Sequence, residues 1–269
     1  MVFRLTGRGH IMRLLSSLLL LLSFNALALP IIPVQNNVTA KSYIVTDTQG
    51  QVLNERDADQ QRPIASITKL MTVMVVLDAN QPLDEDIKLN YKLARKYHTH
   101  LPRSIKTLTR HELIDLAMVK SDNFAAYTLC ANYPGGVEHC LYAMNTKATM
   151  LGMHQTQYTD PTGLEETNVS TARDLIKLIV SASLYPEVLG STRASVDLKV
   201  KKHWWQFNNT NSLVRNTDDV IVSKTGYIHQ SGGCVVMLMN TQFGQRIVAL
   251  LGSKNTRTRI PEAQTVANI

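Results

Sequence analysis

The amino-acid sequence predicts an α+β fold in which a helical cluster packs on a roughly five-stranded antiparallel sheet. Strand-like patterns occur in two separate regions, residues 42–53 and 220–252, and helical patterns fill most of residues 64–184. A chain of 269 residues is long enough to bury one large core. We therefore expect the two strand regions to meet in one sheet and the middle of the chain to supply the helices.

The predicted sheet consists of one hairpin and three further strands. The hairpin covers residues 42–53, with a turn at Thr48-Gln-Gly-Gln51. The other three segments are rich in β-branched and apolar residues, which favours buried strands. They are residues 220–227, 232–239 and 246–252.

The clearest helical segment is Ile67 to Leu77, where nearly every residue is apolar and the helix should be buried on all sides. A capping box at Thr109-Arg-His-Glu112 begins another helix, which ends before Ser121. The remaining helices are expected over residues 124–131, 137–151 and 171–184.

The N-terminus has the pattern of a secretory signal peptide. Basic residues up to Arg13 precede the apolar run Leu14–Phe24 and the sequence Ala26-Leu27-Ala28. We expect a signal peptide over residues 1–28, with an uncleaved anchor as the alternative, an extended lead-in over 29–40 and a catalytic domain over 41–269. Export would place the protein in the periplasm, with no stable membrane insertion after cleavage.

Net charge gives little support to nucleic-acid binding. The formal charge is +7, but three of the 28 basic residues lie in the predicted signal peptide, which leaves 25 basic against 21 acidic residues. This small excess is scattered rather than gathered into a patch.

The cysteines and tryptophans allow more than one interpretation. Cys130 and Cys140 flank a turn and either form a local disulfide or, like Cys234, are small buried thiols. No Cys/His cluster suggests a metal, and we expect no cofactor. For Trp204 and Trp205, core or interface packing is preferred to a substrate platform.

Ser66 and Lys69 lie three residues apart and therefore share one face of the buried helix. A serine hydroxyl is a weak nucleophile at neutral pH, and a lysine whose pKa is lowered by burial can remove its proton. The spacing alone is expected by chance in a chain of this length, so further motifs must support it.

Two further motifs follow in a fixed order: Ser121-Asp-Asn123 between two helices, and Lys224-Thr-Gly226 on a predicted strand. This set occurs in penicillin-binding proteins and class A β-lactamases. Together with Asp160-Pro-Thr-Gly-Leu164 and Ser170-Thr-Ala-Arg-Asp-Leu175, it resembles the low-molecular-mass D-alanyl-D-alanine carboxypeptidase and endopeptidase family of serine peptidases. The resemblance covers roughly residues 40–255, favours the endopeptidases, and implies a β-lactamase/transpeptidase-like fold.

The resemblance also implies catalytic roles. Ser66 would attack the carbonyl of the penultimate D-alanine and form an acyl-enzyme, and Ser121 would relay a proton to the leaving amine. Lys69 would be the general base, with a pKa lowered by burial and by nearby Lys224. Asp122 would have a structural role.

The binding residues follow from the same resemblance. Asn123 would hold the substrate amide and Lys69. Lys224, as a fixed positive charge, would bind the substrate carboxylate with Thr225. Gly226 would let the substrate lie close to the strand. The backbone N–H of Tyr227, with that of the nucleophile, would form the oxyanion hole.

The implied substrates are peptidoglycan peptides, with β-lactams as covalent inhibitors. One alternative is a class A-like β-lactamase, for which Glu165 or Glu166 would have to assist deacylation; another is a non-catalytic wall-binding or β-lactam sensor. We expect residues 253–269 to contain neither the β-rich domain nor the terminal membrane helix of the family's carboxypeptidases. We also expect no long helix against the sheet there, because Pro261 interrupts the helical pattern.

Overall fold

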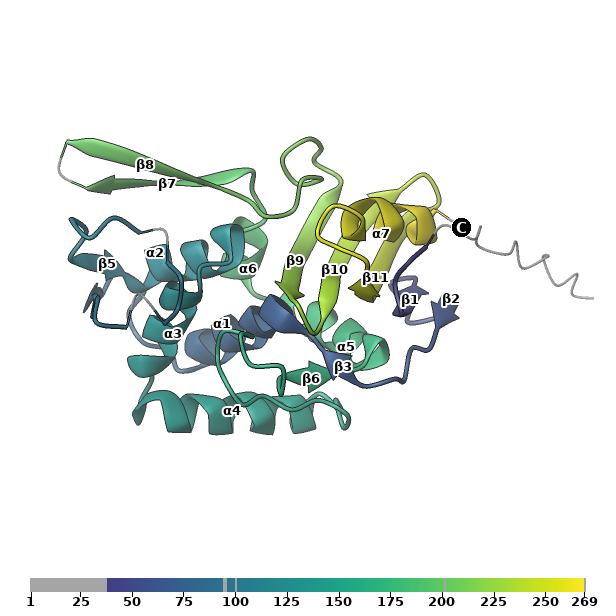
Figure 1. The fold of residues 1–269 in the computed structure, drawn as a ribbon, viewed down its shortest axis with the longest axis horizontal. Coiled ribbons are helices and arrows are strands. Elements are labelled where there is room, and N and C mark those ends of the chain that lie inside the picture. The colour runs from purple at the N-terminus through teal and green to yellow at the C-terminus, as the bar shows by residue number, and fades with distance from the viewer. Residues whose placement is uncertain (1–37, 94–95, 100, 201, 269) are drawn as a thin grey trace, which may run out of the picture. The chain divides into compact units, whose positions relative to one another are not determined.

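A computed structural model describes residues 38–93, 96–99, 101–200 and 202–268. The predicted signal peptide and most of the lead-in lie outside these ranges. The fold class is confirmed, since one antiparallel sheet of five strands has the order β2-β1-β11-β10-β9 (Figure 1). These strands are β1 (Ser42–Thr46), β2 (Val52–Arg56), β9 (Val220–Ile228), β10 (Gly232–Thr241) and β11 (Gly244–Ser253).

The two strand regions meet where β1 pairs with β11, for example with Tyr43 opposite Leu250. In the part of the chain that the structure describes, three short two-stranded sheets lie outside the main sheet. They are β3 (Arg62–Pro63) with β6 (Val169–Ser170), β4 (Asp86–Lys88) with β5 (Thr107–Thr109), and β7 (Ser195–Val200) with β8 (His203–Asn208).

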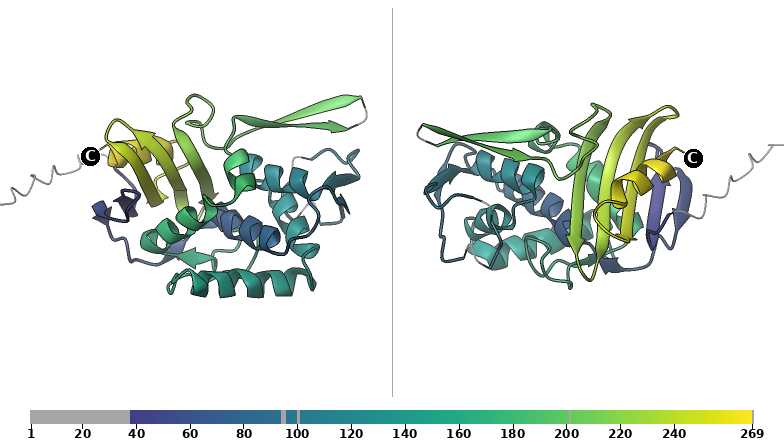
Figure 2. Two further views of the ribbon diagram at one scale, coloured as in Figure 1. Left: turned by 180° about the vertical axis from the view of Figure 1, so that it is seen from behind. Right: turned by 45° about the horizontal axis from the view of Figure 1, so that its top comes forward.

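The helical cluster surrounds α1 (Thr68–Asp78), whose central residues are all buried. This burial explains why its sequence is apolar on every side. Helix α1 packs against α3, α4 and α5, and α5 also packs against the sheet (Figures 1 and 2). The other helices are α2 (Arg110–Asp115), α3 (Asn123–Ala131), α4 (Gly136–Met150), α5 (Ala172–Ala182), α6 (Pro186–Gly190) and α7 (Arg259–Ala267).

Helix α7 corrects the expectation for the C-terminal segment. Pro261 lies in the first turn of α7, where the backbone N–H would have no intrahelical partner in any residue, so proline is tolerated. Ile260, Ala263 and Val266 are buried in an apolar cluster with side chains of β1, β10 and β11. The sheet is therefore covered by this short helix, and the expected interruption at Pro261 is wrong.

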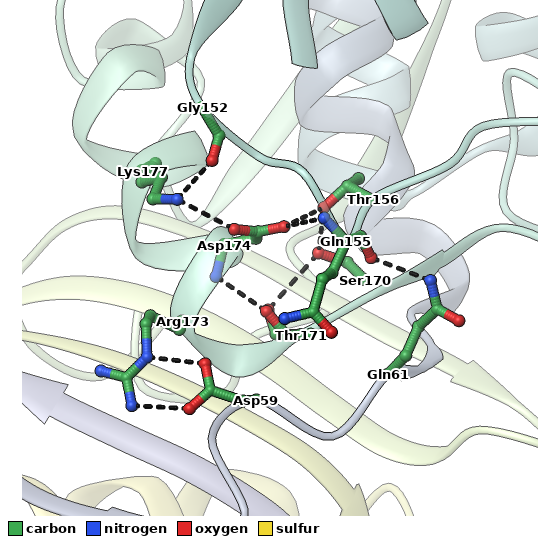
Figure 3. Close-up of polar contacts among 10 residues, drawn as sticks. All are labelled: Asp59, Gln61, Gly152, Gln155, Thr156, Ser170, Thr171, Arg173, Asp174 and Lys177. Carbon is green, nitrogen blue, oxygen red and sulfur yellow. Dashed lines mark hydrogen bonds and ion pairs between the residues drawn. The ribbon is translucent and has the colours of Figure 1, made fainter. Parts of the chain in front are cut away.

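Local signals at helix ends also appear in the structure. The capping box of α2 is formed: the Thr109 hydroxyl accepts from the Glu112 N–H, and the Glu112 carboxylate accepts from the Thr109 N–H. At α5, Thr171 caps the Asp174 N–H, and Asp174 in turn holds the backbone N–H of Gln155. Arg173 of the same helix pairs with Asp59 (Figure 3). The motif Ser170–Leu175 thus fastens two distant loops to α5.

The structure decides the interpretation of the cysteines and excludes core packing for one of the two tryptophans. Cys130 and Cys140 form a disulfide between α3 and α4, with their Cα atoms 5.5 Å apart, while Cys234 is a buried free thiol. Trp204 is 65% exposed and Trp205 is partly exposed on the β7–β8 hairpin, so packing into the core is wrong for Trp204. Within the described ranges, no helix has the length and apolar character needed to cross a bilayer.

Candidate active site

The three sequence motifs converge at one place in the fold. Ser66 lies in a short 3-10 turn, η1 (Ala65–Ile67), directly before α1, and Lys69 lies in the first turn of α1. Ser121 and Asn123 lie where η2 (Leu116–Lys120), a π-helical turn, meets α3. Lys224 lies on β9 and donates to Ser121, and Lys69 on α1 donates to Asn123, so strand β9 and helix α1 both contact the junction of η2 and α3.

Lys69 is at the centre of the first set of contacts. Its Nζ lies 2.8 Å from Ser66 Oγ, 2.7 Å from Asn123 Oδ1 and 2.6 Å from the carbonyl oxygen of Thr162. A neutral amine has two N–H donors and one lone pair. Since two of the three neighbours are amide or peptide oxygens that only accept, the lone pair of neutral Lys69 faces the Ser66 hydroxyl.

The protonation of Lys69 is shifted in the direction that this role requires. Its side chain has no solvent-exposed surface, and burial lowers its pKa to about 7, while the carboxylates of Asp160 and Asp122 partly oppose the shift. Near neutral pH, a large fraction of Lys69 is therefore an unprotonated base. Burial is the main cause, as the sequence predicted.

Lys224 forms the second set of contacts. Its Nζ donates to Ser121 Oγ at 2.8 Å and to the carbonyl oxygen of Thr225 at 3.1 Å. Burial lowers the pKa of Lys224 well below its ordinary value, and the neighbouring Lys69 and Arg259 cations lower it further. Burial and repulsion by these neighbouring cations thus oppose the fixed positive charge that the resemblance implies for Lys224.

Ser121 is held by a specific backbone conformation. It is the C-cap of the π-helical turn and has a left-handed φ of 60°, which is uncommon for a residue other than glycine, asparagine or aspartate. The next residue, Asp122, caps α3 by accepting from the Ala125 N–H, and its other oxygen accepts from the Thr99 hydroxyl. Asp122 is therefore a structural residue that fixes the chain on which Ser121 and Asn123 lie.

The turn that holds Ser66 is tightly enclosed by two glycines. A Cβ on Gly226 would lie 2.7 Å from the carbonyl oxygen of Ile64 and 3.0 Å from the Ser66 nitrogen. A Cβ on Gly163 would lie within 2.0 Å of the carbonyl oxygen of Ala65, a residue that itself has a φ of 48°. The sequence predicted that Gly226 makes room for the substrate. In the structure, the turn that bears Ser66 is the neighbour that leaves no room for a side chain at position 226.

The loop containing Gly163 is organised by Asp160. The Asp160 carboxylate accepts from the backbone N–H groups of Thr162 and Gly163, at 2.6 and 3.0 Å. The loop is fastened to α1 by the Lys69 contact and by a hydrogen bond from the Thr72 hydroxyl to the carbonyl oxygen of Pro161. Asp160 therefore holds the loop, whereas Arg173 binds Asp59 in a different segment.

Three contributors were missed by sequence reasoning. The carbonyl oxygen of Thr162 binds Lys69, but a backbone atom leaves no residue-type signal. Arg259 of α7 donates to the carbonyl oxygen of Gly226 at 2.8 Å, and Thr210 contacts Thr225 through their hydroxyls at 2.7 Å. Only the tripeptide Asn209-Thr-Asn211, with its turn-forming residues, offered a local hint. Tyr227, which the sequence did predict as a site residue, follows Gly226 on β9 and is 46% exposed.

Comparison with known proteins agrees with this geometry. Residues 30–255 match the family model for D-alanyl-D-alanine carboxypeptidase, peptidase S11. A D-alanyl-D-alanine endopeptidase of Pseudomonas aeruginosa is 40% identical over 213 residues, covering 77% of this chain and 69% of the relative. One from Escherichia coli is 38% identical over 224 residues, covering 81% and 72%.

Solved structures give the same result. The Streptomyces K15 DD-transpeptidase superposes with a TM-score of 0.78 at 27% identity, covering 85% of this chain and 95% of that one. Penicillin-binding protein D2 of Listeria monocytogenes, in an ampicillin-bound form, superposes with a TM-score of 0.73 at 26% identity, covering 85% and 96%. The chain therefore belongs to the D-alanyl-D-alanine carboxypeptidase family of serine-type peptidases, peptidase S11.

Proposed function

We propose that this protein hydrolyses D-alanyl peptide bonds of peptidoglycan through an acyl-enzyme on Ser66. The contact geometry of Lys69 carries the proposal, because two of its three polar neighbours are acceptors that leave its lone pair for the Ser66 hydroxyl. Lys69 takes the hydroxyl proton as Ser66 attacks the carbonyl carbon, and the resulting tetrahedral oxyanion collapses to the acyl-enzyme. Ser121, bonded to Lys224, relays to the leaving amine the proton that Lys69 has taken. Water then attacks the carbonyl carbon of the acyl-enzyme, and Lys69 moves a proton from this water to the Ser66 oxygen as the acyl group leaves.

Backbone N–H groups at Ser66 and Tyr227 are the proposed oxyanion donors. Ser66 begins a buried helical segment, where the exposed N–H groups favour a developing negative charge. The tight approach of Gly226 brings strand β9 against the Ser66 turn, which supports a shared site for the two N–H groups.

Lys224 and Thr225 are the proposed partners of the substrate carboxylate. A buried lysine whose pKa is lowered by desolvation and by neighbouring cations gains most from an incoming anion, because the carboxylate stabilises the ammonium form. Binding of a carboxylate substrate is therefore expected to raise the pKa of Lys224.

The endopeptidase activity, which cleaves the D-alanyl crosslink between stem peptides, is preferred to removal of a terminal D-alanine. Three relatives described as endopeptidases are 40%, 38% and 32% identical to this chain, whereas carboxypeptidases of Streptomyces sp. and Bacillus subtilis are 31% and 26% identical. The proposed place of action is the periplasm, on the basis of the signal-peptide pattern in residues 1–28.

The β-lactamase alternative is less well supported. Rapid deacylation needs a base held against the acyl-enzyme, but the Glu165 and Glu166 side chains are both exposed. β-Lactams are proposed as inhibitors that form a slowly hydrolysed acyl-enzyme on Ser66. In this site the proposed base, Lys69, contacts the proposed nucleophile, Ser66, and this arrangement gives no support to a non-catalytic sensor role.

The deciding experiment is digestion of purified crosslinked muropeptide dimers. Conversion of dimers to monomers is expected, and loss of terminal D-alanine with dimers intact would favour the carboxypeptidase activity instead. Steady, rapid turnover of a chromogenic cephalosporin would overturn the peptidase assignment in favour of a β-lactamase. Failure of a fluorescent penicillin to label Ser66 would refute the acyl-enzyme.

A further inference from the structure

Thr210 lies between the two elements that form the proposed carboxylate site, and no motif includes it. Its backbone N–H donates to the carbonyl oxygen of Val119, in the π-helical turn just before Ser121, at 3.1 Å. Its hydroxyl lies 2.7 Å from the hydroxyl of Thr225 on β9. One residue therefore joins the chain that carries Ser121 to the strand that carries Thr225.

The turn that bears Thr210 is fixed on both sides by asparagines that are themselves buried. The Asn209 side chain donates to the carbonyl oxygen of Arg193 at 3.0 Å and accepts from the Asn211 N–H at 2.8 Å. The Asn211 side chain donates to Ser223 Oγ on β9 at 3.1 Å. These hydrogen bonds hold the turn in place, and with it the Thr210 hydroxyl.

The proton order between the two hydroxyls depends on what Thr225 binds. Either hydroxyl can donate when nothing else is present. Once Thr225 donates its single proton to a carboxylate, its oxygen can only accept from Thr210. A donor chain from Thr210 to Thr225 to the carboxylate polarises both hydrogen bonds in the same direction and strengthens them.

We infer that Thr210 is a positioning residue that orients the Thr225 hydroxyl toward the carboxylate of the substrate or inhibitor. This inference rests on the proposed function, in which Thr225 contacts that carboxylate. Without the Thr210 hydroxyl, Thr225 would keep its donor but lose the partner that fixes its rotation and satisfies its oxygen. Thr225 is only 3% exposed, so water is a poor substitute for that partner.

The test compares benzylpenicillin with its methyl ester, which differ only in the carboxylate. Second-order rate constants for acylation of the full-length protein are measured by intact mass for Thr210→Val, Thr210→Ser and Thr225→Val. We expect Thr210→Val to slow acylation by benzylpenicillin roughly 3- to 10-fold, the worth of one hydrogen bond, and to change acylation by the ester less than about twofold. Thr210→Ser, which keeps the hydroxyl, should restore the benzylpenicillin rate to within about twofold of the unmodified protein.

A double variant separates positioning from general damage. If Thr210 acts through Thr225, adding Thr210→Val to Thr225→Val should cost nothing further. Because acid and ester are compared on one sample, the ratio of their rates is independent of the fraction of protein that is folded. Equal losses for acid and ester, or additive losses in the double variant, would overturn the inference while leaving the proposed function intact. If Thr225→Val itself does not distinguish acid from ester, the carboxylate site fails and the inference fails with it.

Discussion

Raising the pH from 6 to 8 should accelerate acylation of Ser66 by benzylpenicillin about tenfold. The reason is the pKa of Lys69, which burial lowers to about 7. With that pKa, the neutral base makes up about one eleventh of the protein at pH 6 and about ten elevenths at pH 8. Since the pKa is lowered, activity is lost as the pH falls through 7 and levels off above about 8.

A solvent-exposed lysine predicts a different curve. With its usual pKa of 10.5, the neutral fraction would rise about 100-fold between pH 6 and 8 and would continue to rise beyond about pH 9. The assay is the second-order acylation rate constant, measured by intact mass or by quenching of a fluorescent penicillin across this range. A rate that is flat with pH, or that still rises tenfold per unit above pH 8, would refute the assignment of Lys69 as the buried base.

The variant Asp122→Asn tests the electrostatic part of this reasoning. The Asp122 carboxylate raises the pKa of Lys69, so its neutralisation should move the pH profile to lower pH. Asparagine can still accept from the Ala125 N–H and can donate to the Thr99 hydroxyl, which keeps the cap of α3. Asp218→Asn, on an exposed loop, removes the same charge elsewhere and should leave the midpoint unchanged. A shift of the Asp122→Asn profile to higher pH would contradict the electrostatic assignment.

Three further predictions concern the nucleophile, the packing of its turn and the disulfide. Ser66→Ala should abolish penicillin labelling and leave thermal unfolding nearly unchanged; residual labelling would identify another nucleophile. Gly226→Ala should lower the free energy of unfolding by about 1–3 kcal/mol in urea titrations and also slow acylation, because its Cβ would collide with the Ser66 turn. Gly190→Ala, with open space around the new Cβ, should change the free energy of unfolding by less than about 0.5 kcal/mol. Equal effects of the two variants would contradict the packing argument. Replacing both Cys130 and Cys140 by alanine should lower the free energy of unfolding by about 2–4 kcal/mol, since the disulfide closes a loop with a sequence separation of 10. An unchanged urea midpoint would count against the disulfide.

Elements with strong local signals were predictable from the sequence. The buried helix α1 follows from a continuous apolar segment, and the start of α2 follows from a capping box whose two hydrogen bonds are both formed. The five-stranded sheet followed from β-rich segments in two regions of the chain. These features depend on residue type and short spacing, which a single sequence displays directly.

Features that depend on tertiary contacts were predicted poorly. Helix α7 was rejected because Pro261 opposes a helix interior, but the apolar surface of the sheet stabilises a short helix that has the proline in its first turn. The sequence could not distinguish a disulfide between Cys130 and Cys140 from two buried thiols, because the choice depends on how closely α3 and α4 approach each other in the fold. Exposure of Trp204 depends on a hairpin whose outer face has no partner among the described residues.

The site shows the same division. The side chains proposed to react, among them Ser66, Lys69 and Lys224, could be proposed from the sequence, because the chemistry requires particular residue types at particular spacings. Only the tertiary structure shows the surroundings that support these roles: the complete burial of Lys69, its contact with the backbone oxygen of Thr162, and the approach of Gly226 to the Ser66 turn. Desolvation and backbone contacts arise from segments far apart in the chain, and neither leaves a mark in the local residue pattern.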